Sequence, residues 1–136
     1  MKELFAACDL KDLDIDLLQS RFLNRSIFGI VLMEGGLCFS YFPEFGLGDK
    51  PGKGRIGYLC FFAESFLSGL LRKRILELPM FAPGNRVEYV LSERDREKAI
   101  LLFLKIIQEQ DSTYPYKFDL IRTYLTQLFH LVMKMG

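Results

Sequence analysis

The last third of the chain decides the fold. Residues Ser92–Gly136 read SERDREKAILLFLKIIQEQDSTYPYKFDLIRTYLTQLFHLVMKMG. Ser92 is a residue type favoured as a helix N-cap, and Asp95, three residues later, is acidic as first turns prefer. Apolar residues then recur at the spacing of one helical stripe, at Ala99, Ile100, Phe103, Leu104 and Ile107. This spacing predicts a long helix with a single buried stripe.

A second long helix is predicted to begin at Pro115, because proline is favoured in the first helical turn. One face of this helix carries Phe118, Ile121, Leu125, Leu128 and Val132. A neighbouring face shares Leu128 and adds Tyr124, Leu131 and Met135. A helix with so wide an apolar surface is either central to a core or pairs with a partner. We expect a homodimer whose interface consists of Tyr124, Leu128, Leu131 and Met135.

Length and composition limit the remaining possibilities. A chain of 136 residues forms one domain, and 18 basic against 17 acidic residues give no general electrostatic case for nucleic-acid binding. No apolar run is long enough to span a bilayer, so we expect no membrane contact. Cys8, Cys38 and Cys60 are odd in number and lie far apart among apolar neighbours. They are therefore predicted to be free buried thiols in a reducing cytoplasm.

The first two thirds of the chain predict strands. Buried strands are expected at residues 27–33 (IFGIVLM), 37–42 (LCFSYF) and 56–62 (IGYLCFF), with a short final strand at residues 87–91. Glu34-Gly35-Gly36 is typical of a hairpin turn, and residues 43–54 (PEFGLGDKPGKG) are predicted to be a loop. Residues 63–71 are predicted to form a short helix, followed by Arg72-Lys73-Arg74.

This order of strands followed by helices predicts an α+β fold in a single domain of residues 1–136. Residues 1–62 would supply a small antiparallel sheet or an incomplete barrel. Residues 63–91 would supply the short helix, an irregular bridge and the final strand, and residues 92–136 a C-terminal antiparallel helical hairpin.

Several segments together resemble a known family. They are Gly57–Leu67 (GYLCFFAESFL), Leu76–Phe81 (LELPMF), Leu91–Glu93 (LSE), Ile121–Leu125 (IRTYL) and the early strand with its glycine turn, Ser26–Gly36. The chain resembles the N-terminal effector-binding and dimerisation domain of AraC-type transcriptional regulators. The resemblance implies a cupin-like β-barrel, a helical hairpin that dimerises, and a helix-turn-helix DNA-binding domain that normally follows.

The chain departs from this family pattern in two ways. Only 62 residues precede Ala63, too few for a closed barrel of about eight strands, and the first ten are expected to contribute little strand. We therefore expect an open sheet in which the effector cavity is lost or reduced to a shallow groove. Residues 1–136 show no recognition helix with a preceding turn, where the family normally has a helix-turn-helix domain, so we expect no DNA contact by this chain alone.

Side-chain chemistry predicts neither an enzyme nor a cofactor. The single histidine, His130, cannot by itself supply a metal-binding cluster or serve as a base for the distant cysteines. Gly52-Lys53 looks like the end of a phosphate-binding loop but lacks both the first glycine and the following Ser or Thr. Arg72-Lys73-Arg74 is interpreted as a set of cations that closes the short helix.

The candidate effector site lies on the strands, at Phe28, Phe39, Tyr41 and Tyr58. An apolar cavity with a few polar groups is what a small effector needs, but Phe-rich strands also simply fill a core. The sequence leaves both interpretations open. The leading functional hypothesis is the sensory and dimerisation domain of an AraC-like regulator. The alternative is a stand-alone interaction protein that dimerises but binds neither effector nor DNA.

Overall fold

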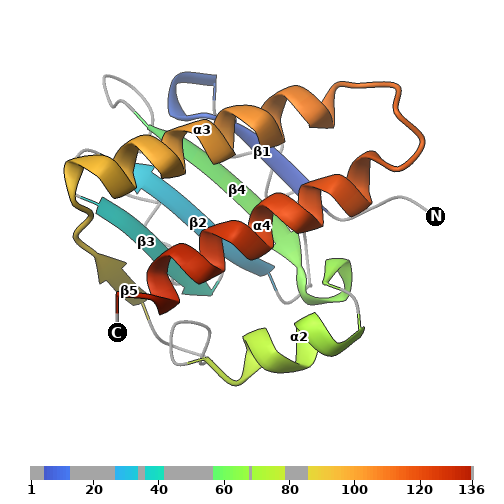
Figure 1. The fold of residues 1–136 in the computed structure, drawn as a ribbon. Helices are drawn as coiled ribbons and strands as arrows, with labels where there is room; N and C mark the ends of the chain where they lie inside the picture. The colour runs from blue at the N-terminus through green and yellow to red at the C-terminus, as the bar shows by residue number, and fades with distance from the viewer. Residues whose placement is uncertain are drawn as a thin grey trace.

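The computed structural model has one antiparallel β-sheet with two long helices packed side by side across one of its faces (Figure 1). It describes residues 5–12, 27–33, 36–41, 57–67, 69–78 and 86–135. The α+β class predicted from the sequence is confirmed. The loop expected at residues 43–54 and the turn residues Glu34 and Gly35 lie outside the described residues.

The sheet has five strands, β1 (Phe5–Asp9), β2 (Ile27–Met33), β3 (Gly36–Tyr41), β4 (Tyr58–Ala63) and β5 (Arg86–Tyr89). Their order across the sheet is β1-β4-β2-β3-β5, and each neighbouring pair is antiparallel. At the centre, Ile30 on β2 lies opposite Phe39 on β3 and Cys60 on β4. The described strands form an open sheet with β1 and β5 at its edges, so the prediction of an open sheet rather than a barrel is confirmed.

The edge strand β1 is absent from the sequence prediction, which was wrong for the first ten residues. Phe5-Ala6-Ala7-Cys8-Asp9 contains few strongly strand-forming residues, so its local propensity is weak. The strand exists because it pairs along its whole length with β4, from Phe5 opposite Phe62 to Asp9 opposite Tyr58. Tertiary pairing, which a single sequence does not reveal, overrides the local preference.

The short helix predicted at residues 63–71 is present, but its bounds differ from the prediction. Strand β4 continues to Ala63, a 3-10 turn covers Glu64–Phe66, and helix α2 (Gly69–Leu76) begins only after Leu67 adopts an extended conformation. Gly69 has φ +51°, a backbone conformation that favours glycine. The basic residues 72–74 therefore lie inside α2 rather than after a helix.

Helices α3 (Glu93–Gln110) and α4 (Lys117–Met133) form the predicted antiparallel hairpin (Figure 1). The N-cap prediction is confirmed, because the Ser92 hydroxyl accepts a hydrogen bond from the Asp95 backbone N–H at 3.1 Å. Helix α4 begins two residues after Pro115, with Tyr116 at its N-cap position and Pro115 in the preceding turn.

The face of α3 that packs on the sheet differs from the predicted stripe. Its buried residues are Ala99, Leu102, Phe103 and Ile106, whereas Leu104 is 44% exposed. Residues 99–107 are apolar at all positions except Lys105, so the spacing alone fits more than one stripe. Packing against the sheet determines which stripe is buried. Phe103 stacks on Tyr58 of β4 with ring centroids 6.1 Å apart.

Gly36 is required where β5 joins the sheet. Its φ of +153° lies in a region that side chains rarely adopt, and an added Cβ would lie 2.2 Å from the carbonyl oxygen of Tyr89. Only a residue without a side chain lets the end of β5 approach β3 this closely.

The outer edge of β1 is covered by one side chain. The Gln110 amide accepts a hydrogen bond from the Ala7 N–H through Oε1 at 2.8 Å and donates one to the Ala7 carbonyl through Nε2 at 2.9 Å. The amide thus occupies the place of a neighbouring strand. Edge strands with unpaired backbone groups invite pairing with other chains, and this contact removes one such pair of groups.

We expect Gln110→Ala to lower the free energy of unfolding by about 1–2 kcal/mol, because the backbone groups of the mostly buried Ala7 lose both partners. The control is Gln108→Ala on the exposed side of the same helix, which should change stability by less than about 0.5 kcal/mol. Urea unfolding measures both variants. Equal effects of the two substitutions would contradict a structural role for the Gln110 amide.

Candidate interaction surface on the two long helices

Two of the four residues predicted to line an effector pocket, Phe28 and Phe39, lie in the core instead. Phe28 and Phe39 are 0% exposed, and Phe39 packs against Phe129 of α4 with ring centroids 6.3 Å apart. Tyr58 is half-buried against Phe103. Tyr41 lies on β3 opposite Phe28, and its side chain is outside the described residues. Of the two interpretations left open by the sequence, the filled core describes Phe28 and Phe39.

The predicted dimer interface is divided by the structure. Leu128 is 0% exposed and belongs to the core beneath α4, so it is not available to a partner. Tyr124 and Leu131 are half-buried, and the Lys105 ammonium lies 5.8 Å from the Tyr124 ring centroid. Met135 is 40% exposed. The predicted face thus belongs partly to the core and partly to the boundary between α3 and α4.

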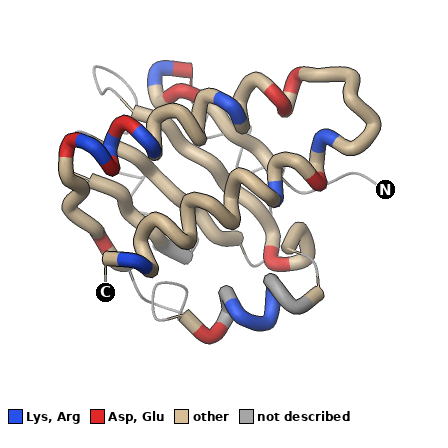
Figure 2. Tube along the Cα trace, viewed as in Figure 1, with Lys and Arg blue, Asp and Glu red and all other residues tan. Residues whose placement is uncertain are grey.

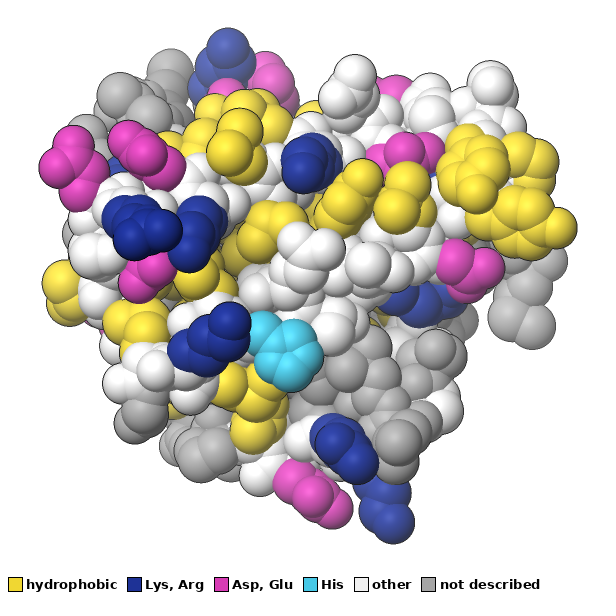
Figure 3. Space-filling model, viewed as in Figure 1, with side chains coloured by type: hydrophobic (Ala, Val, Ile, Leu, Met, Phe, Trp, Pro, Cys, Tyr) yellow, Lys and Arg dark blue, Asp and Glu magenta, His cyan; other side chains and the backbone are white. Residues whose placement is uncertain are grey.

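A groove runs between α3 and α4 on the side of the hairpin that faces away from the sheet. Its volume is about 710 Å³. Its apolar lining consists of Leu101 and Leu102 on α3, Leu131 near the end of α4, and Met135, two residues after α4. Its charged lining is Asp95, Lys98, Lys105 and Lys134, with His130 and Gln127 completing it. Figure 3 shows this face of the molecule, with His130 in cyan beside a lysine and hydrophobic side chains between the two helices.

The outward face of α3 carries a second exposed surface. Six exposed residues follow one another at intervals of three and four, and they are Arg94, Glu97, Leu101, Leu104, Gln108 and Asp111. Leu101 is 58% and Leu104 44% exposed, and both are large hydrophobic side chains in the middle of this helix. We call these six residues the α3 seam. Alternation of three and four is the spacing by which helices pair in coiled coils.

Charge is distributed unevenly along the hairpin. Figure 2 shows acidic and basic residues alternating at the N-terminal end of α3 and few charges along the middle of α4. The charged residues of the α3 seam stand near its two ends, with Arg94 in the first turn and Asp111 just after the last. Leu101 and Leu104 lie between them.

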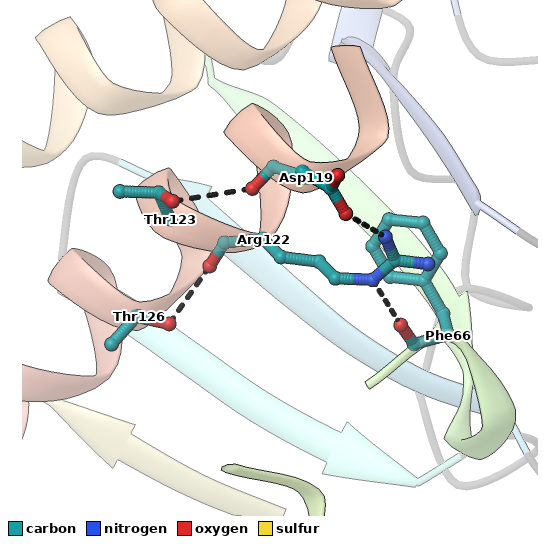
Figure 4. Close-up of polar contacts among 5 residues, drawn as sticks. All are labelled: Phe66, Asp119, Arg122, Thr123 and Thr126. Carbon is teal, nitrogen blue, oxygen red and sulfur yellow. Dashed lines mark hydrogen bonds and ion pairs between the residues drawn. The ribbon is translucent and has the colours of Figure 1, made fainter. Parts of the chain in front are cut away.

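Arg122 holds α4 to the 3-10 turn that follows β4 (Figure 4). Its Nε donates to the Phe66 carbonyl, its guanidinium lies 4.3 Å from the Phe66 ring centroid, and its Nη1 contacts the Asp119 carboxylate at 3.1 Å. The side chain is 16% exposed. Arg122 therefore acts as a structural clamp, and it falls within the IRTYL segment of the family resemblance.

The cysteines are held as thiols. Burial raises the pKa of the Cys8 thiol to about 11, with the nearby Asp12 and Asp9 carboxylates adding to the shift. Burial likewise raises the pKa of the fully buried Cys60. Cys8, Cys38 and Cys60 form no disulfide. Since the thiolate is the nucleophile, neither Cys8 nor Cys60 is activated near neutral pH.

Other candidate chemistry lies elsewhere on the surface. On α2, Arg72 pairs with the Glu64 carboxylate at 2.6 Å, and Lys73 and Arg74 are exposed. Within the described residues, no group of three or more His, Cys, Asp or Glu side chains could hold a metal ion. None of the described helices combines the length and apolar character needed to cross a membrane.

Comparison with known proteins adds no assignment, because no protein-family model matches the chain and no curated protein shows significant similarity to it. The functional argument therefore rests on the surfaces described above.

Two leucines separate core from surface on the hairpin. Leu128→Ala should lower the free energy of unfolding by about 2–5 kcal/mol, because it empties part of the core under α4. Leu101→Ala, on the exposed α3 seam, should change it by less than about 0.5 kcal/mol in dilute protein. Chemical denaturation measures both. An unchanged stability for Leu128→Ala would place this residue outside the core.

Proposed function

We propose that the chain is the dimerisation module of an AraC-like transcriptional regulator, and that two copies associate through the α3 seam. The observation that carries the proposal is the self-complementary order of residues along this seam. The family resemblance supplies the regulatory context, and the exposed leucines supply an apolar contact.

The self-complementarity follows from a two-fold axis. In a symmetric dimer the same surface meets its own copy, so an antiparallel pair of α3 helices reverses the order of residues. Reversal about the point between Leu102 and Phe103 places Leu101 opposite Leu104 of the second copy. The same register places Arg94 opposite Asp111 and Glu97 opposite Gln108. Apolar side chains then meet at the centre, and opposite charges meet at both ends.

The sensory part of the family function receives less support. Phe28 and Phe39 are fully buried under the helices, so no effector can contact them without separating α4 from the sheet. We therefore propose association, rather than effector binding on the sheet, as the function of this domain. The stand-alone interaction protein remains the second candidate and shares the same dimer surface.

Leu104→Glu tests the proposed dimer. It introduces a charge at the centre of the interface while leaving the core untouched, since Leu104 is 44% exposed. We expect dimer affinity to fall at least about tenfold, as for truncation of a central contact residue, with the circular-dichroism spectrum unchanged. Sedimentation velocity over a concentration series measures the association.

Val90→Glu is the matched control, because Val90 is 80% exposed and follows β5 rather than lying on α3. It should leave association unchanged. A wild-type chain that stays monomeric at high concentration, or a Leu104→Glu variant that dimerises as well as wild type, would overturn the proposal.

A charge exchange tests the register. Arg94→Asp and Asp111→Arg should each weaken association, because each brings like charges together at both ends of the interface. The double variant should recover most of the loss. The two residues lie about 25 Å apart along one helix, so coupling between them cannot arise within a single chain. A double-mutant cycle of dissociation constants measures the coupling, and strictly additive effects would contradict this register.

A further inference from the structure

We infer that the groove between α3 and α4 is a docking site for an acidic amphipathic helix from a partner protein. The site differs from the α3 seam, although Leu101 lies at the boundary between the two. The inference does not depend on the proposed dimer.

The shape of the groove suits a third helix. Its apolar lining is open to the side away from the sheet. This lining consists of Leu101 and Leu102 from α3, Leu131 from α4 and Met135 just after α4. Two helices packed side by side present such a trough, and an amphipathic helix fills it with residues spaced three and four apart. Leu102 is nearly buried while Leu101 and Met135 are well exposed, so the lining offers both a floor and sides.

The charge of the groove selects the partner. Three lysines, Lys98, Lys105 and Lys134, line it against one aspartate, Asp95, so these groups leave two positive charges with His130 counted as neutral. The whole chain carries only +1, which means that positive charge is concentrated here. A second copy placed groove to groove would bring three more lysines against the first three. Charge complementarity therefore favours an acidic partner over self-association at this site.

The distribution of the lysines favours a helix over a small anionic ligand. Lys98 and Lys105 stand on one wall, seven residues and about 10 Å apart along α3, whereas Lys134 lies just after α4 on the other. A single carboxylate headgroup can engage only one of these positions. A helix with acidic residues one heptad apart on both flanks of its apolar stripe can engage all three.

Two synthetic peptides of about three heptads test the inference. Both carry leucine at the two apolar heptad positions, and the flanking positions carry glutamate in one peptide and lysine in the other. Fluorescence anisotropy measures their binding to the full chain. We expect the glutamate peptide to bind at least about tenfold more tightly than the lysine peptide, and its affinity to fall as salt is raised.

The variant Lys98→Glu/Lys134→Glu should weaken binding of the glutamate peptide at least about tenfold, because it reverses charge on both walls of the groove. Lys73→Glu/Arg74→Glu on α2 makes the same change in net charge away from the groove and should leave binding unaltered. Neither pair includes a residue of the α3 seam. Dimerisation should therefore persist in both variants, so the two proposals can fail separately.

Four outcomes would overturn the inference. Equal binding of both peptides, or equal losses in the groove and control variants, would show non-specific attraction. If no peptide binds, and the backbone amides of Leu131 and Met135 become protected from hydrogen exchange when the chain self-associates, the groove would be assigned to a second copy. Tight binding of dodecanoate that the glutamate peptide cannot displace would assign it to a small anionic amphiphile.

Discussion

The contact on which the rest of this structure depends is the seat of α4 on the aromatic face of the sheet. Phe129 packs against Phe39 of β3 and Phe62 of β4, with ring centroids 6.3 and 6.4 Å away. Burying such rings supplies much of the apolar stabilisation available to a domain of this size. The same contact occupies the face on which an effector would have to bind. The same side chains could either fill the core or line an internal cavity. In this structure they fill the core.

With this face of the sheet covered, the α3 seam and the groove are the surfaces that the hairpin exposes. The α3 seam has apolar residues at its centre and opposite charges at its ends, whereas the groove has an apolar floor and one prevailing charge. A self-complementary surface suits a second copy, and a surface of one sign repels its own copy. The two surfaces therefore suit different partners, although they lie on neighbouring sides of the same helix.

The parts of the fold that local signals determine could be predicted from the sequence. The Ser92 cap, the IFGIVLM strand of β2 and the hairpin of α3 and α4 each have an unambiguous local pattern. Strand β1 could not be predicted, because FAACD becomes a strand only by pairing with β4. The outward position of Leu104 could not be predicted either, and Leu128 lies on both apolar faces that the sequence indicates for its helix. Both helices are apolar on more than one face, and only the sheet fixes their rotation. The Gln110 contact joins residues 103 positions apart, and no spacing rule indicates it.

The structure of the sheet edges favours the proposed association of the helices over strand pairing between copies. An open five-stranded sheet has two edges, and strand pairing between copies would compete with pairing of helices. At β1 the Gln110 amide already bonds the N–H and carbonyl of Ala7, so a further strand would have to displace it. At the opposite edge β5 is only four residues long, and short edge strands offer few backbone groups to a neighbour. Helix α3 supplies Gln110 from its last turn and the seam from its outer face. One helix thus blocks part of the β1 edge and also carries the surface that we propose for association.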